Sequence, residues 1–198
     1  MEHLKKAILI DLDGTVCDSR LPISYLNGEK DTDNYDVYFR ILDKVTPNTS
    51  VITDIIQNCT VLGGDRASRW QDKFADITLV FLTSRNAGYY SMMHTLKFVE
   101  ENFKLPLSSE NVKADFYFRP INYHCSSLQY KMEKFSILKN MYHFVHIYED
   151  ELQNVEMFYK YKQEKCLVHW VKNSYNFALN DTPQKISLPM DKIIIHEL

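Results

Sequence analysis

The sequence lacks the long apolar run, the dense block of one charge and the signal-like N-terminus that mark several large classes of protein. No stretch approaches the roughly 20 apolar residues that a membrane helix needs. The 23 basic and 26 acidic residues leave a formal charge of −3, without a dense Lys/Arg block that would support strong non-specific nucleic-acid binding. The apolar run after Lys6 is cut at Asp11, too early for a signal-peptide core. We therefore expect a cytoplasmic protein without a membrane segment.

Cysteine is scarce and its spacing is irregular. Cys17, Cys59, Cys125 and Cys166 form no Cys-x-x-Cys pair, and no histidine stands beside them at metal-ligand spacing. We expect buried or free thiols. Cys17 follows an acidic motif, but no neighbouring residue marks it as an activated nucleophile.

Apolar runs and helical patterns alternate along the 198 residues, a length at which one domain buries roughly 70% of its unfolded surface. Runs suited to strands occupy residues 7–10, 77–82, 116–118, 144–148 and 166–171. Helical spacing of apolar residues occurs at 47–58, 87–103, 130–142 and 151–161. This alternation predicts a single α/β domain over 1–198 with a central parallel sheet flanked by helices.

Two segments interrupt the alternation. Residues 16–46 are mostly polar, so we expect a loop or small flap that borders the site. Residues 172–198 form a C-terminal extension, in which a polar stretch leads to the apolar residues 192–195. That short run is either an added edge strand or the beginning of something longer.

The first apolar run leads into Asp11-Leu12-Asp13-Gly14-Thr15. Because Leu12 would point the other way on a strand, both carboxylates can face one crevice, where a divalent cation would offset their repulsion. Gly14 permits a sharp exit from the strand. A carboxylate held by a metal can attack phosphorus, while its neighbour moves the leaving-group proton. The alternative interpretation is an ordinary Asp-Gly turn.

Polar residues also follow two other predicted strands. Thr83-Ser84-Arg85 ends the second run, where hydroxyls and a guanidinium can bind a phosphate; Ser84 could instead cap a helix. Glu149-Asp150-Glu151 ends the fourth run. Mg²⁺ prefers oxygen ligands, so Asp11, the backbone carbonyl of Asp13 and Asp150 form a candidate Mg²⁺ site.

These motifs, in this order, resemble those of haloacid dehalogenase (HAD) superfamily phosphatases over the chain up to about residue 171. The resemblance implies a Rossmann-like HAD fold and Mg²⁺-dependent hydrolysis through a phospho-aspartate. Asp11 would be the nucleophile and Asp13 the general acid and base, with Thr15 holding Asp13. The second-motif hydroxyl is either Thr83 or Ser84, since family members with Thr-Gly-Arg favour the first and those with Ser-Arg favour the second.

The resemblance also assigns a lysine and a further acid. The family's third motif is a lysine near the start of a helix, for which Lys131 and Lys134 both qualify. The spacing from Arg119-Pro120 to Lys131 is similar to that in the phosphatase domains of phage-type polynucleotide kinases, so Lys131 is our choice. Glu149 stands where the family usually has aspartate, and it would bind the metal directly or through water.

The substrate class depends on what covers the site. Family members with small-molecule substrates commonly carry a large cap, for which the segments between the motifs leave little room. We therefore expect no large cap domain and a phosphorylated macromolecule as partner. Residues 149–155 resemble the Asp-Asp-Glu-x-x-Asn-Ile stretch of eukaryotic magnesium-dependent protein-tyrosine phosphatases, which favours a phosphoprotein and phosphotyrosine.

Two alternatives stay open. A polynucleotide 3′-phosphatase is favoured by the Arg119-Pro120 to Lys131 spacing and by residues 30–39, which are similar to the phage-type domains. The other alternative is a non-catalytic binding module with a HAD fold, against which the intact acids and lysine argue.

Overall fold

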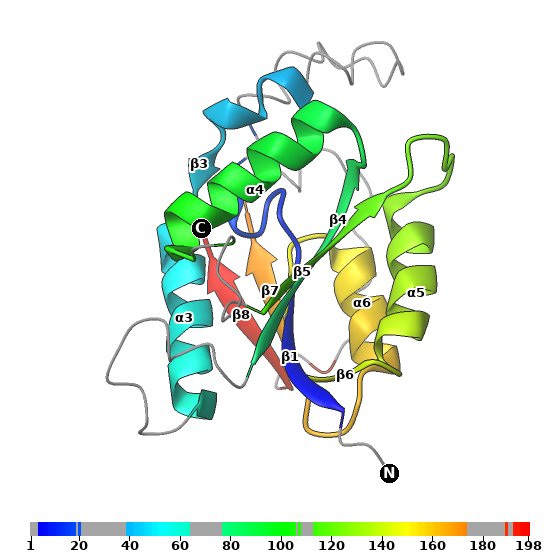
Figure 1. Ribbon diagram of the computed structural model, residues 1–198. Helices are drawn as coiled ribbons and strands as arrows, with labels where there is room; N and C mark the ends of the chain where they lie inside the picture. Colours follow the sequence, from blue (N-terminus) through cyan, green and yellow to red (C-terminus); the bar gives the residue numbers. More distant parts are fainter. Residues whose placement is uncertain are drawn as a thin grey trace.

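The computed structural model describes residues 4–18, 20, 39–63, 77–105, 107, 113–173, 189 and 192–198. A six-stranded sheet forms its centre, in the order β5-β4-β1-β6-β7-β8, and every neighbouring pair is parallel (Figure 1). The strands are β1 (Lys5–Ile10), β4 (Thr78–Asn86), β5 (Ala114–Arg119), β6 (Tyr142–Glu149), β7 (Leu167–Lys172) and β8 (Ile193–Glu197). The predicted Rossmann-like α/β class is confirmed.

Helices cover both faces of the sheet (Figure 1). The helices of the described residues are α3 (Thr49–Gly63), α4 (Tyr89–Phe103), α5 (Ser127–Leu138) and α6 (Leu152–Tyr161). Buried residues of α3 and α4 pack in one hydrophobic cluster with Ile8 and Ile10, and those of α5 and α6 pack in another with Ala7 and Leu9. Because side chains alternate along a strand, β1 serves both cores, which explains its continuous apolar run.

The strand order places the topological switch point of the sheet at β1. Strands β4 and β5 continue the sheet on one side of β1, and β6, β7 and β8 continue it on the other. In open α/β sheets, ligands bind beyond the carboxyl ends of the strands at the point where the order reverses. The acidic motifs after β1 and β6 and the hydroxyl motif of β4 therefore meet at one edge.

Three short elements of the described part of the chain lie outside the central sheet and its four helices. Strands β2 (Cys17–Asp18) and β3 (Thr46–Pro47) form an antiparallel pair, and η1 (Leu42–Lys44) is a short 3-10 helix. Of the predicted flap over 16–46, residues 19 and 21–38 lie outside the described residues, so the flap and the absence of a large cap stay predictions. Strand β8 is the added edge strand, one of the two expectations for residues 192–195.

None of the helices within the described ranges combines the length and the hydropathy needed to cross a bilayer.

Candidate functional site

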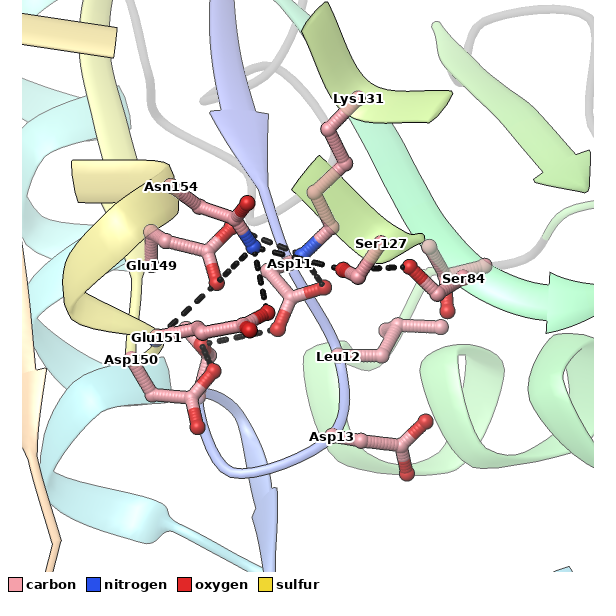
Figure 2. Close-up of polar contacts among 12 residues, drawn as sticks. Asp11, Leu12, Asp13, Ser84, Ser127, Lys131, Glu149, Asp150, Glu151 and Asn154 are labelled. Atoms are coloured by element: carbon pink, nitrogen blue, oxygen red, sulfur yellow. Dashed lines mark hydrogen bonds and ion pairs between the residues drawn. The ribbon is translucent and has the colours of Figure 1, made fainter. Parts of the chain in front are cut away.

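Three buried carboxylates and one buried ammonium lie together beyond β1 and β6 (Figure 2). Asp11 directly follows β1, Glu149 is the last residue of β6, and Asp150 comes next. Oxygens of these three side chains all lie within 4.8 Å of one another, so they could hold a metal ion. Lys131 reaches the group from α5.

Lys131 is paired with two of the carboxylates. Its Nζ donates to Asp11 Oδ1 at 2.7 Å and to Glu149 Oε2 at 2.8 Å. Burial alone would lower the pKa of Lys131, but the charges of Asp11 and Glu149 outweigh it and raise that pKa above its ordinary value. The side chain is therefore an ammonium that neutralises part of the acidic group.

Glu149 is committed to protein partners at both oxygens. Besides the Lys131 contact, Glu149 Oε1 accepts from the backbone N–H of Glu151 at 3.2 Å and from Asn154 Nδ2 at 3.3 Å. Burial and the neighbouring Asp11 charge raise the pKa of Glu149, although Lys131 opposes them. Glu149 thus orients Lys131, and a metal contact from Glu149 stays a prediction.

Thr15 joins the two aspartates. Its Oγ1 lies 3.1 Å from Asp11 Oδ2 and 3.2 Å from Asp150 Oδ1. The chain turns sharply after Leu12, and the Leu12 carbonyl accepts from the backbone N–H of Thr15 at 3.2 Å. This turn directs the Thr15 hydroxyl to Asp11 and Asp150. The expectation that Thr15 holds Asp13 was therefore wrong.

Gly14 and Asn173 complete the turn. Gly14 has φ +84°, and a Cβ at this position would lie 2.1 Å from Asp150 Oδ2. Asn173 Nδ2 donates to the Gly14 carbonyl at 2.9 Å and lies 3.4 Å from Asp150 Oδ2. Sequence reasoning missed Asn173, although it follows the predicted strand 166–171 in the same way that the acids follow theirs.

Asp13 and Arg85 bind each other. Arg85 Nε donates to Asp13 Oδ2 and its Nη2 donates to Asp13 Oδ1, both at 2.7 Å, while Nη1 donates to Thr95 Oγ1 on α4 at 2.7 Å. The Asp13 carboxylate points away from the Asp11 group (Figure 2). This differs from the expectation that both acids face one crevice, because β1 ends at Ile10 and Asp13 lies in the turn, where strand alternation no longer applies.

The two candidate hydroxyls lie in different surroundings. Thr83 is buried and its Oγ1 accepts from the backbone N–H of Arg85 at 3.1 Å. Ser84 is half-buried, and its hydroxyl donates to Ser127 Oγ at 2.8 Å. Ser127 lies one helical turn before Lys131, so Ser84 faces the Lys131 side of the sheet (Figure 2). Sequence reasoning missed Ser127. Its position at the start of a helix was the feature that could have indicated it.

Some of the residues on which the two substrate predictions depend have partners within the protein. Arg119 Nη1 donates to the backbone carbonyl of Cys125 at 3.2 Å, so this arginine shapes the loop before α5. The Glu151 carboxylate accepts from Asn154 Nδ2 at 2.8 Å at the start of α6. Of residues 30–39, all but Phe39 lie outside the described residues.

No protein-family model and no curated protein matches the chain. Among solved structures, a chain of the Pnkp1/Rnl/Hen1 complex matches 98% of this chain, with 16% sequence identity and a TM-score of 0.39. This chain spans 45% of that chain's length. A likeness at this level assigns neither a family nor a function.

Proposed function

We propose that the chain is a Mg²⁺-dependent phosphomonoester hydrolase of the haloacid dehalogenase type, acting through a phospho-aspartate on Asp11. The observation that carries the proposal is the fixed position of the Asp11 carboxylate at the end of β1. One oxygen accepts from Lys131 at 2.7 Å and the other lies 3.1 Å from the Thr15 hydroxyl. A carboxylate oriented in this way beside a cation suits a nucleophile towards phosphorus.

The charge of the group fits a divalent metal. Asp11, Glu149 and Asp150 bring three buried carboxylates together with one ammonium, that of Lys131. Buried charge is costly unless it is compensated, and an oxygen-rich set of ligands suits Mg²⁺. Asp11 and Asp150, with the Asp13 backbone carbonyl, would hold the ion, and Glu149 would bind it directly or through water. When bound, Mg²⁺ would neutralise charge on the phosphoryl oxygens.

The proposed reaction has two steps, formation and hydrolysis of the phospho-aspartate. In the first, an Asp11 oxygen forms a bond to phosphorus, the bond from phosphorus to the leaving oxygen breaks, and protonated Asp13 supplies that oxygen with its proton. In the second, Asp13 takes a proton from water, which attacks phosphorus and releases phosphate and free Asp11. Lys131 stabilises the phosphoryl oxygens throughout, and so does Ser84 once its hydroxyl turns from Ser127 Oγ to the substrate.

Asp13 must change partners to perform this role. In the structure both its oxygens accept from Arg85, so neither is available to the leaving group. Exposed over 28% of its side chain, Asp13 can turn towards bound substrate, whereas the Arg85 side chain is 1% exposed and fixed against α4. Arg85 would then act as the resting partner of Asp13, and its expected phosphate contact stays a prediction.

For the substrate we propose a phosphorylated macromolecule, with phosphotyrosyl protein first. The similarity of residues 149–155 to protein-tyrosine phosphatases supports this choice, and the formal charge of −3 gives no separate support to nucleic acid. The alternative of a 3′-phosphorylated polynucleotide keeps its support from the Arg119-Pro120 to Lys131 spacing, since Arg119 uses only one of its N–H groups for the Cys125 carbonyl.

Two assays test the proposal. Purified protein should hydrolyse a generic aryl phosphate in the presence of Mg²⁺, and Asp11→Asn should reduce kcat by about a thousandfold or more. Asp43→Asn, which alters an exposed acid on η1, is the matched control and should leave kcat unchanged. Hydrolysis that survives Asp11→Asn would contradict a phospho-aspartate.

The second assay compares a phosphotyrosyl peptide, a phosphoseryl peptide and a 3′-phosphorylated oligonucleotide at equal concentrations. We expect the highest kcat/KM for the phosphotyrosyl peptide. A higher value for the oligonucleotide would overturn the substrate choice and retain the reaction type.

A further inference from the structure

A second set of metal-ligating side chains lies on the α3 side of the sheet, apart from the Lys131 group. Asp54 comes from α3, His169 from β7 and His196 from β8. Asp54 Oδ2 lies 3.8 Å from His169 Nδ1 and 3.7 Å from His196 Nε2, and the two nitrogens are 2.9 Å apart. Three donor atoms from three elements therefore surround one point.

The spacing of these atoms matches that of a small metal site. When nitrogen and oxygen ligands bind a tetrahedral Zn²⁺ at about 2.0–2.2 Å, neighbouring donor atoms stand about 3.3–3.6 Å apart. The observed separations of 2.9, 3.7 and 3.8 Å fall on both sides of that range. An ion would need only small movements, in which the two nitrogens separate and the carboxylate approaches.

Neighbouring side chains already orient the ligands. His169 Nε2 lies 2.8 Å from His146 Nδ1, so a ring that bound metal through Nδ1 could donate its Nε2–H to His146. Asp54 Oδ2, the oxygen that faces the two rings, accepts from the hydroxyl of Tyr148 at 2.6 Å and from Asn58 Nδ2 at 3.2 Å. An ion bound to Oδ2 would take the place of the longer Asn58 contact, and Asn58 Nδ2 would keep its bond to the Tyr148 hydroxyl at 2.7 Å. Second partners of this kind fix ring and carboxylate orientation in metal sites.

The three candidate ligands differ in their exposure to solvent. The side chain of His169 is only 2% exposed, whereas those of Asp54 and His196 are 34% and 18% exposed. An ion can therefore enter from solvent, and a water molecule can supply a fourth ligand. Two imidazoles and one carboxylate suit Zn²⁺ and related transition metals, in contrast to the all-oxygen set proposed for Mg²⁺.

We propose that Asp54, His169 and His196 bind one divalent transition-metal ion of the Zn²⁺ type. The ion joins α3 to β7 and to the edge strand β8, and so fastens the C-terminal strand to the sheet. This site is separate from the proposed hydrolase site and does not depend on the proposed reaction.

Metal titration tests the site directly. Chelator-treated protein in excess Mg²⁺, which occupies oxygen-only sites, is titrated with Zn²⁺ by calorimetry and with Co²⁺ by visible absorption. We expect one Zn²⁺ per chain with a Kd of about 1 μM or below, a rise in Tm and the intense spectrum of tetrahedral Co²⁺. His196→Ala should weaken binding at least about tenfold, and His146→Leu about 10- to 100-fold.

Two controls separate this site from others. His124→Ala removes an exposed histidine outside the cluster, and Asp150→Asn alters the acidic group; both should bind Zn²⁺ as the unchanged protein does. Asp54→Asn replaces His196→Ala if that variant fails to fold by circular dichroism. Unchanged affinity in the folded cluster variants, or millimolar binding by the unchanged protein, would overturn the proposal.

Discussion

At the scale of single residues, Lys131 illustrates how an ionised group can persist inside the protein. Its ammonium is almost completely buried and contacts the carboxylates of Asp11 and Glu149. Removing one member of a buried ionic group leaves the others uncompensated, which costs far more than losing an exposed pair. The stability of the protein and the orientation of Asp11 therefore depend on the same side chain.

Replacing Lys131 should consequently harm folding as well as activity. We expect Lys131→Met to reduce the free energy of unfolding by about 3–5 kcal/mol, because two buried carboxylates lose their cation. Urea unfolding monitored by circular dichroism measures the change. Lys134→Met, three residues along the same helix and half-exposed, loses the contact of its ammonium with the Tyr117 ring, 5.7 Å from the ring centroid, and should change stability by about 1 kcal/mol or less. Equal effects of the two substitutions would contradict the importance of the ionic group.

The turn after β1 requires glycine at position 14, because any Cβ there would meet the Asp150 carboxylate. Gly14→Ala places a Cβ 2.1 Å from Asp150 Oδ2 at φ +84°, so we expect a loss of more than about 1 kcal/mol of stability and weaker Mg²⁺ binding. Unfolding and metal titration measure the two effects. At Gly88 the closest atom to an added Cβ is Asn86 Oδ1 at 2.9 Å, the end of a side chain that can move. Gly88→Ala should therefore leave Mg²⁺ affinity unchanged, and a matching loss there would refute the explanation.

The thiols should differ in reactivity according to burial. Burial raises the pKa of both Cys59 and Cys166 to about 12, so at neutral pH these side chains stay protonated as well as covered. Cys125 is only half-buried, and we expect it to react first with a thiol reagent. Absorbance on titration with a disulfide reagent measures the rates. A fast phase that persists in Cys125→Ser would show that another cysteine is accessible.

At the scale of elements, the edge strand β8 depends on the first of its three consecutive isoleucines. Ile193 is buried in a cluster with Val155, Val168 and Trp170, whereas Ile194 is 40% exposed. Because side chains alternate across a strand, these neighbours face different surroundings. The packing of β8 against α6 is therefore carried by Ile193.

This difference gives a paired test with identical chemistry. We expect Ile193→Ala to cost about 2–4 kcal/mol of unfolding free energy, since it leaves a cavity in that cluster, and Ile194→Ala to cost less than about 0.5 kcal/mol. Denaturant unfolding of the two variants decides the matter. If Ile194→Ala were the more damaging, the register of β8 on β7 would have to be shifted by one residue.

At the scale of the whole molecule, the candidate hydrolase site is assembled by strand order. Asp11, Ser84 and Asp150 come from or directly follow β1, β4 and β6, which are neighbours in space, and Lys131 comes from a helix on one face. A ligand that binds this assembly stabilises the folded state by mass action.

Mg²⁺ should therefore raise the thermal stability of the protein. At a concentration 100 times its Kd, a metal bound only by the folded state adds about 2.7 kcal/mol, which appears as a higher Tm. We expect this increase to disappear in Asp150→Asn and to persist in Asp115→Asn, whose carboxylate lies on β5 and binds Tyr142. Scanning calorimetry with and without Mg²⁺ measures it. A metal-dependent rise retained in Asp150→Asn would exclude Asp150 as a ligand.

The amino-acid sequence was sufficient to predict the alternation of strands and helices. The central apolar runs and the helical spacings appear as strands and helices close to their expected ranges, because residue periodicity alone decides which side chains can be buried together. The same pattern brought Asp11 and Asp150 to attention at the ends of predicted strands, whereas Lys131 came from the resemblance to haloacid dehalogenase phosphatases.

Tertiary structure decided which side chains bind each other. Arg85 binds Asp13, Thr15 lies between two aspartates, and Asn173 reaches Gly14 across the chain. The histidines of the proposed second metal site stand 27 residues apart in sequence, with no recognisable spacing. Local sequence fixes the face on which a side chain lies, but strand order and the turn after β1 fix its partner, since both depend on contacts between distant segments.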